Sequence, residues 1–209
     1  NKTVDPAVVV MDDAGNHAVS LLSGHLGGAN RLTETVAQIV GADFVITTAT
    51  DVHRLPAMDM LAADRGLVIE NPGAIKAVNM AILAHRPIPL HDPLGLFPKE
   101  VAGLQWAPWA PTAAPGVFID DIQTEPSDDV LVLRPASLCA GIGCNRGTDA
   151  EEIRQLLTSV IEEYGLAIRS LYRIGTIDIK RDEAGILAVA RDLECSMEFY
   201  TKDELNRVA

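Results

Sequence analysis

The sequence predicts an α/β protein made of two consecutive small α/β units with glycine-rich strand-to-helix loops. Short apolar and β-branched runs alternate with segments of helical period along the whole chain. Two glycine loops, at 23–30 and 141–147, each follow an apolar run and precede a helix-period run. A polar stretch at 125–129 separates the two patterns. We therefore expect one region at 1–126 and a second at 127–209.

The first unit is expected to begin with a β-hairpin, because two apolar runs flank the turn residues 12–16. Asn30 is suited to cap the helix behind the glycine loop, and Gly41 to end it. The expected elements are strands at 7–10, 17–22 and 43–48, helices at 31–40 and 57–65, a strand at 67–70, a helix from Asn71-Pro72, a Pro-containing edge strand at 86–90 and a strand at 117–119.

The second unit is expected to open with a strand at 130–133. Its glycine loop leads through 148–151, the pattern of a capping box, into the helix with the clearest period of the chain. The apolar positions of that helix are Ile153, Leu156, Leu157, Val160, Ile161 and Tyr164. A helix at 183–193, a strand at 196–200 and a final helix after Thr201 follow, whereas 171–179 is ambiguous.

Composition excludes several classes of protein. The 209 residues carry a formal net charge of −12 and only 4% aromatics, which argues against nucleic-acid binding. Three cysteines without a repeating spacing favour a reducing compartment and match no zinc pattern. No apolar run is long enough to span a bilayer, and the first residues lack the pattern of a signal peptide. We expect a cytoplasmic protein with no nucleic-acid partner, no membrane partner and no metal site of its own.

The first glycine loop is the strongest candidate site. It places His25, whose pKa ordinarily lies near neutrality, among glycines whose amides, with the following helix, suit an anion. The alternative is that the His25 ring bonds a backbone carbonyl and shapes the loop. Ser23 can be a nucleophile, but a turn or cap hydroxyl is favoured because the flanking pattern of a nucleophile elbow is missing.

Polar residues at 47–51 follow a predicted strand, and ligands gather at the carboxyl ends of strands in open α/β sheets. Asp51 can orient His25 or activate water, and it can equally cap the next helix.

The second loop does not match a dinucleotide fingerprint, because Arg146 stands where the third glycine belongs. Arg146 beside loop amides suits a carboxylate or phosphate instead. Cys144 is either a reactive thiol or a small packing residue. Lys180 and Glu183 form an exposed ion pair or face the loop.

Long runs of the chain resemble a known family. The runs 5–10, 20–30 and 45–51 resemble the CbiG family, the cobalt-precorrin-5A hydrolases of anaerobic cobalamin synthesis. The runs 141–148 and 176–185 look like the carboxyl-terminal domain of that family, to which CobE, a small separate protein of the aerobic pathway, is similar. Members normally carry further segments at both ends, so we expect the second region to be incomplete.

The resemblance implies a hydrolase acting on a carbon–carbon bond. Water opens a δ-lactone that joins the ring A acetate of a cobalt tetrapyrrole to the former meso carbon. That carbon and its methyl group then leave as acetaldehyde, which gives cobalt-precorrin-5B. Cobalt is carried by the substrate, so no cofactor is expected, and other enzymes of the cobalamin pathway are candidate partners. The alternatives are a non-catalytic corrinoid-binding or carrier module and an anion- or nucleotide-binding protein of unrelated role.

Our assignment of roles rests on the residues rather than on the family. We expect His25 to act as general base toward water, Asp51 to orient it, and amides of 27–29 to stabilise the oxyanion. Ser23 is the third candidate catalytic residue. The residues expected to bind substrate are Gly27, Gly28, Asn30, Arg31, Thr48, Lys76, Gly141, Gly143, Cys144, Arg146, Thr176, Lys180 and Glu183.

Overall fold

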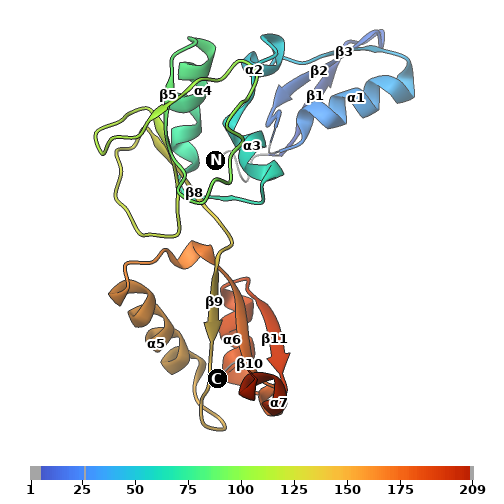
Figure 1. Cartoon of the computed structure of the whole chain (residues 1–209). Helices are drawn as coiled ribbons and strands as arrows, with labels where there is room; N and C mark the ends of the chain where they lie inside the picture. The colour runs from blue at the N-terminus through green and yellow to red at the C-terminus, as the bar shows by residue number, and fades with distance from the viewer. Residues whose placement is uncertain (1–5, 26, 208–209) are drawn as a thin grey trace. The chain divides into compact units, whose positions relative to one another are not determined.

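The computed structural model describes residues 6–25 and 27–207 and divides the chain into two compact units (Figure 1). The first unit comprises the residues up to Ile119 together with Glu125–Leu133. The second comprises Asp120–Thr124 and the residues from Arg134 onward. Each unit contains strands and helices, and the described residues form three sheets, which confirms the predicted α/β class.

The first unit begins with a small three-stranded sheet of order β1-β2-β3. β1 (Val8–Met11) and β2 (His17–Leu22) form the expected antiparallel hairpin, and β3 (Asp43–Val45) runs parallel to β2. α1 (Ala29–Val40) packs on this sheet and ends at Gly41, which adopts a left-handed conformation at φ 75° as predicted. β3 is shorter than predicted, so 47–48 lie beyond the strand.

The start of α1 corrects one expectation. Gly28, at φ 79°, occupies the position before the helix, and Asn30 lies inside the first turn rather than capping it. Glycine adopts this left-handed conformation without a steric penalty, so it can close the loop where Asn30 was expected to do so. The side chain of Asn30 is thereby released for other contacts.

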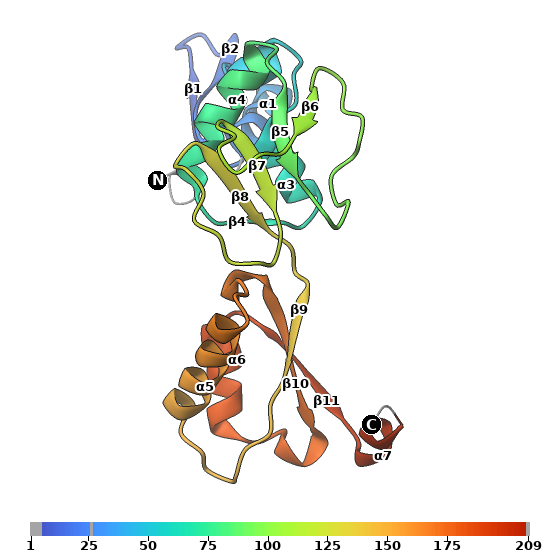
Figure 2. The same ribbon diagram turned by 60° about the vertical axis from the view of Figure 1, so that its left-hand side comes forward.

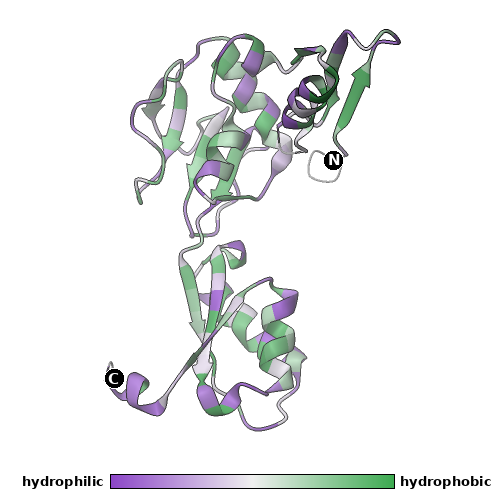
Figure 3. Cartoon of the chain, turned by 90° about the vertical axis from the view of Figure 1, so that its right-hand side faces the viewer, coloured by the Kyte–Doolittle hydropathy of each residue, from purple (hydrophilic) through white to green (hydrophobic). Residues whose placement is uncertain are grey.

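The larger sheet of this unit has the order β4-β8-β7-β5-β6. β7 and β8 are buried at every residue, and Figure 3 shows their ribbons to be largely hydrophobic. Met58, Ile75, Val78 and Ile82 pack against them, the last three from the helix that the sequence predicts after Pro72. The elements are α2 (Ala49–Val52), α3 (Met58–Asp64), β4 (Val68–Ile69), η1 (Pro72–Ala74), α4 (Ile75–Leu83), β5 (Ile88–His91), β6 (Trp106–Pro108), β7 (Gly116–Ile119) and β8 (Val130–Arg134).

β5 is not the edge strand that Pro89 suggested. It pairs in parallel with β6 on one side and with β7 on the other. A proline removes one backbone donor from a ladder, and here the flanking Ile88 and Leu90 carry the pairing, with the amide of Ile88 donating to Gln105. The edge position goes to β6 instead.

The second unit contains a three-stranded parallel sheet of order β11-β10-β9. α5 and α6 pack on each other and lie on the same side of the sheet (Figures 1 and 2). The ambiguous stretch at 171–179 is mostly strand. The elements are β9 (Leu138–Gly141), α5 (Ala150–Glu163), η2 (Ile168–Ser170), β10 (Leu171–Ile177), η3 (Asp178–Lys180), α6 (Ala184–Asp192), β11 (Ser196–Tyr200) and α7 (Lys202–Asn206).

α5 has the predicted helical period but begins and packs differently from expectation. Asp149, not Thr148, caps the helix, because its side chain accepts the amide of Glu151. Ile153 and Ile161 are buried, whereas Leu156 is 66% exposed. Part of the apolar stripe therefore faces away from the core.

Candidate active site in the first unit

The first glycine loop is held in a tight bend by its own backbone. The amide of Gly28 donates to the carbonyl of His25, and that of Ala29 donates to the carbonyl of Ser23. A Cβ atom on Gly27 would run into the Cβ of Ser23. The loop therefore requires glycine at this position, and the amides of Gly28 and Ala29, expected to face an oxyanion, are already used within the bend.

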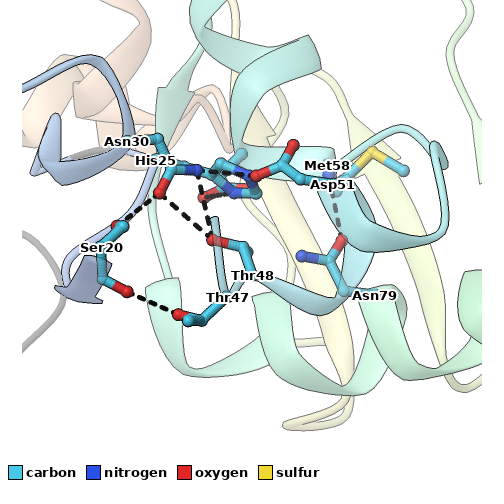
Figure 4. Close-up of polar contacts among 9 residues, drawn as sticks. Ser20, His25, Asn30, Thr47, Thr48, Asp51, Met58 and Asn79 are labelled. Carbon is cyan, nitrogen blue, oxygen red and sulfur yellow. Dashed lines mark hydrogen bonds and ion pairs between the residues drawn. The ribbon is translucent and has the colours of Figure 1, made fainter. Parts of the chain in front are cut away.

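Asn30 connects the loop to β2 and to the segment at 47–51 (Figure 4). Its side-chain oxygen accepts a hydrogen bond of 2.6 Å from the hydroxyl of Ser20, which lies within β2. Its amide nitrogen donates to Asp51 Oδ2 at 2.7 Å and to Thr48 Oγ1 at 3.2 Å. The hydroxyl of Thr47 completes the link by donating to the carbonyl of Ser20 at 2.6 Å. Asn30, Thr48 and Asp51, predicted as site residues, thus lie together.

His25 lies between two carboxylates. Its Nε2 is 2.9 Å from Asp51 Oδ2, on α2, and its Nδ1 is 3.4 Å from Asp59 Oδ2, on α3. The side chains of His25 and Asp59 are 10% and 7% exposed, whereas that of Asp51 is 40% exposed. The ring is therefore enclosed on the Asp59 side and reaches solvent on the Asp51 side.

The two carboxylates favour the protonated ring. The pKa of His25 is raised above its ordinary value of 6.5, chiefly because Asp59 accepts a hydrogen bond from the ring. Desolvation opposes this rise, and Asp51 adds to it. A ring with a carboxylate at each nitrogen donates through both, which is the hydrogen-bonding pattern of imidazolium.

Asp59 is the site residue that sequence reasoning missed. It lies 34 positions after His25 in the chain, and no local motif connects the two. The available signal is that Asp59 stands between Met58 and Met60 and that a charged residue among apolar ones at the start of a helix must find a partner.

Ser23, Arg31 and Lys76 are the remaining predicted site residues of the first unit. Ser23 adopts a left-handed backbone at φ 58° and its carbonyl accepts a loop amide, as a turn residue does. Arg31 and Lys76 are exposed, on α1 and α4.

The charged residues of the second glycine loop bind one another. Arg146 pairs with Asp182 at 2.5 Å and donates to the carbonyl of Ile179 at 2.9 Å. The buried Glu183 accepts the amide of Gly147 at 2.8 Å and the ammonium of Lys180 at 3.1 Å. These bonds, that from Gly147 first, lower the pKa of Glu183 below its ordinary value of 4.5. Their effect is to tie the loop to the turn at 178–183.

An apolar groove of about 540 Å³ runs beside this loop. Gly141, Gly143 and Cys144 line it from the loop side, and Leu156 and Val160 line it from α5. The exposed part of the apolar stripe of α5 therefore faces this groove. Thr176 lies on β10, where its hydroxyl donates to the carbonyl of Ile142 at 2.8 Å.

The described residues contain neither a cluster of metal ligands nor a helix suited to crossing a membrane. No group of three or more His, Cys, Asp or Glu side chains in the described part of the chain is arranged to hold a metal ion. None of the helices at 6–25 and 27–207 combines the length and the apolar character that crossing a membrane requires.

Family models match almost every part of the chain. The model described as "Cobalamin synthesis G N-terminal" matches 1–51, "Cobalamin biosynthesis central region" matches 56–135, and "Cobalamin synthesis G C-terminus" matches 138–209. The chain belongs to the cobalamin synthesis G (CbiG) family. His25 and Asp51 lie in the stretch matched by the first model, and Asp59 lies in the stretch matched by the central one.

Curated relatives carry a named activity. The chain is 34% identical to the cobalt-precorrin-5A hydrolase of Priestia megaterium, over 100% of the chain and 60% of that protein. It is 34% identical to the cobalt-precorrin-5A hydrolase of Salmonella typhimurium, over 98% of the chain and 61% of that protein. The chain thus spans about three fifths of the length of these relatives.

Two further proteins are similar to this chain, one over about a third of its length and one over nearly all of it. CobE of Sinorhizobium sp is 34% identical over 65 residues, 31% of the chain and 42% of that protein. A crystal structure of a cobalamin biosynthesis protein G homologue from Sulfolobus solfataricus aligns over 99% of the chain and 60% of that structure, with 24% identity and a TM-score of 0.35.

Proposed function

We propose that this chain performs the cobalt-precorrin-5A hydrolase reaction of cobalamin biosynthesis. The observation that carries the proposal is its similarity, over its whole length, to two proteins named for that activity. The His–carboxylate cluster of the first unit supplies groups that this chemistry needs. These groups act through charge and proton transfer, and the cobalt belongs to the substrate.

The reaction requires groups that accept and return protons at oxygen. Water loses a proton and adds to the lactone carbonyl, and the ring C–O bond breaks to give a carboxyl and a hydroxyl group. Loss of the hydroxyl proton then forms the C=O of acetaldehyde while the C–C bond to the macrocycle breaks. The electron pair of that bond stays with the macrocycle, so no outside oxidant or reductant is needed.

The geometry supports a division of roles different from the one that the sequence suggested. While both His25 nitrogens face carboxylates, the ring has no lone pair to accept a proton from water. We assign the base to Asp51, which is 40% exposed and bound through Oδ2 by His25 and Asn30. Its second oxygen, Oδ1, takes the proton of the attacking water. Protonated His25 donates to the substrate oxygen on which negative charge develops.

The substrate is a polycarboxylate, and the chain has a net charge of −12, so local cations must hold it. Arg146 and Lys180 are already paired with Asp182 and Glu183. We therefore assign the acidic groups of the macrocycle to the exposed Arg31 and Lys76 of the first unit.

The proposal extends to the cellular compartment and to the partner enzymes. Cys139, Cys144 and Cys195 are free thiols, which supports a reducing compartment such as the cytoplasm. Because the substrate is an intermediate with a lactone already formed, the enzymes that form it and consume the ring-opened product are the expected partners.

A non-catalytic corrinoid-binding module is the second candidate. The observation that favours it is the groove of about 540 Å³ in the second unit, the part of the chain that is similar to CobE. A carrier would bind the macrocycle without releasing acetaldehyde.

Acetaldehyde release from purified cobalt-precorrin-5A tests the proposal. The wild-type chain should release acetaldehyde, and His25→Gln should slow release by about 100- to 10,000-fold. His17→Gln is the matched control, because His17 is an exposed histidine of the β1–β2 hairpin. Binding of the macrocycle without acetaldehyde release would support the carrier instead, and equal rates for wild type and His25→Gln would refute the assigned site.

A further inference from the structure

Asp59 is a carboxylate in an unusual environment. The residue is 5% exposed and lies in the first turn of α3. A buried carboxylate is costly unless hydrogen bonds or a cation compensate for the lost hydration. An ion-pair partner for this carboxylate is His25, whose Nδ1 lies 3.4 Å from Asp59 Oδ2. The protonated ring therefore neutralises Asp59, and Asp59 stabilises the proton on the ring.

The position of Asp59 is fixed by the core and not by the loop. The amide of Met58, the preceding residue, donates to Asn79 Oδ1 on α4 at 3.0 Å, a contact drawn in Figure 4. Met58 itself is fully buried against Ile75 and its neighbours. Asp59 thus presents its carboxylate from a packed helix, whereas His25 lies in an irregular loop. A group on a rigid element orients one on a loop better than the reverse.

The two nitrogens of the ring therefore have different surroundings. Nδ1 faces the enclosed Asp59, and Nε2 faces Asp51, which is 40% exposed. We propose that Asp59 is a positioning residue: its carboxylate accepts a hydrogen bond from Nδ1–H of His25 and thereby directs Nε2–H outward, toward Asp51 and a bound lactone oxygen. The identity of that oxygen rests on the proposed function, but the orientation of the ring does not.

The arrangement determines which proton of His25 is transferable. The Nδ1 proton is held by a buried carboxylate, so the Nε2 proton leaves first when the ring loses its charge. Among the residues that the structure describes, the charged groups in contact with the ring are Asp51 from α2 and Asp59 from α3, while Asn30 and Thr48 beside Asp51 are uncharged. The raised pKa of His25, whose largest cause is Asp59, agrees with this arrangement.

NMR titration of the His25 ring in the intact chain tests the inference without substrate. His25→Gln identifies the ring signal. Asp59→Asn, which keeps the shape of the side chain, should lower the pKa of His25. Asp64→Asn, at an exposed carboxylate of the same helix, should leave that pKa unchanged. An unchanged His25 titration in a folded Asp59→Asn protein would overturn the proposal.

A measurement on the wild type covers the case in which Asp59→Asn does not fold. Above its pKa, the neutral His25 ring should carry its remaining proton on Nδ1, as read from the ¹⁵N shifts of the two nitrogens. A proton on Nε2 in the neutral ring would contradict the proposed role of Asp59.

Kinetics then separate a positioning role from a purely structural one. Asp59→Asn should slow acetaldehyde release and move the high-pH loss of activity to lower pH, because His25 loses its proton earlier. In a His25→Gln background, Asp59→Asn should cause no additional loss, and a further large loss would mean that Asp59 acts independently of His25. If the wild type releases no acetaldehyde, the proposed function fails while the NMR result still decides the role of Asp59.

Discussion

The two glycine loops of this chain are both rich in glycine and differ in the residues that surround them. Both join a strand to a helix and both contain a residue that can be charged, His25 in one and Arg146 in the other. At the first loop, carboxylates from α2 and α3 enclose His25 and raise its pKa above 6.5. At the second, Asp182 pairs with Arg146, which keeps its charge throughout the physiological range. The glycine-rich sequence therefore predicts a bend in the backbone. Side chains from other helices determine whether that bend is a proton-transfer site.

Glycine has a different role in the two loops. Replacing it should therefore give the largest difference in the rate of acetaldehyde release between the two loops. A Cβ at Gly27 would clash with Ser23, whereas in the described part of the chain a Cβ at Gly143 would meet no atom within 4 Å. Gly27→Ala should reduce acetaldehyde release by about 100-fold or more, because the bend that presents His25 cannot close. Gly143→Ala should leave the rate nearly unchanged. The opposite order of effects would place the reaction at the second loop.

The sequence predicts correctly those elements whose pattern is contained in a few neighbouring residues. The strand at His17–Leu22 and the end of α1 at Gly41 agree with the prediction, because an apolar run beside a turn and a glycine after a helix are short-range features. Asn30 shows where such reasoning fails. The residue type suits a helix cap, yet its side chain bonds Asp51 and Thr48, which lie 21 and 18 positions away.

The site was predictable in part for the same reason. His25 and Asp51 were identified from a glycine loop and a strand end, and the structure brings them within 2.9 Å. Their catalytic roles remain predictions. Asp59 was not identifiable, because it lies on α3, 34 positions from His25, and meets the ring only in the folded chain. The sequence offered the Lys180–Glu183 ion pair as one of two alternatives, and the structure contains that pair, with Glu183 buried. The pairing of Arg146 with Asp182 becomes visible only in the fold.

The stability of the two units should respond to pH in opposite directions, and this is the second largest expected effect. The pKa of His25 is raised above 6.5, so its contribution to stability is present below 6.5 and is lost as pH rises through the folded-state pKa. The pKa of Glu183 is lowered below 4.5, so its contribution is present above 4.5 and is lost as pH falls through the folded-state pKa. The first unit should weaken toward alkaline pH and the second toward acid pH.

The chain supplies separate probes for these two transitions. Both tryptophans, Trp106 and Trp109, lie in the first unit, and all three tyrosines, at 164, 172 and 200, lie in the second. Tryptophan fluorescence and the NMR signals of the tyrosine rings therefore report on different units during thermal unfolding. His25→Gln should remove the alkaline loss from the tryptophan transition only. Parallel pH profiles for both probes would show that the ion pairs of the loops do not govern these transitions.

A smaller effect is expected from Glu183, the buried carboxylate that accepts an amide of the second loop. Glu183→Gln removes the charge that receives Lys180 and leaves this ammonium, whose side chain is 12% exposed, without compensation. The unfolding temperature reported by the tyrosines should fall, while the tryptophan transition stays where it is. Glu162→Gln, at an exposed position of α5, is the control and should change neither transition. A tyrosine transition that stays unchanged in Glu183→Gln would mean that the loop is anchored by its backbone alone.

The smallest effect is expected at Arg146, and it decides whether the second loop binds acidic groups of the substrate. The guanidinium already pairs with Asp182 and donates to Ile179, so a substrate carboxylate would have to displace both contacts. Arg146→Gln should therefore change the KM for the macrocycle by no more than about twofold, with kcat unaffected. Arg31→Gln, at an exposed cation of the first unit, should raise KM more and should weaken the dependence of KM on ionic strength. A larger rise in KM for Arg146→Gln than for Arg31→Gln would return the anion-binding role to the second loop.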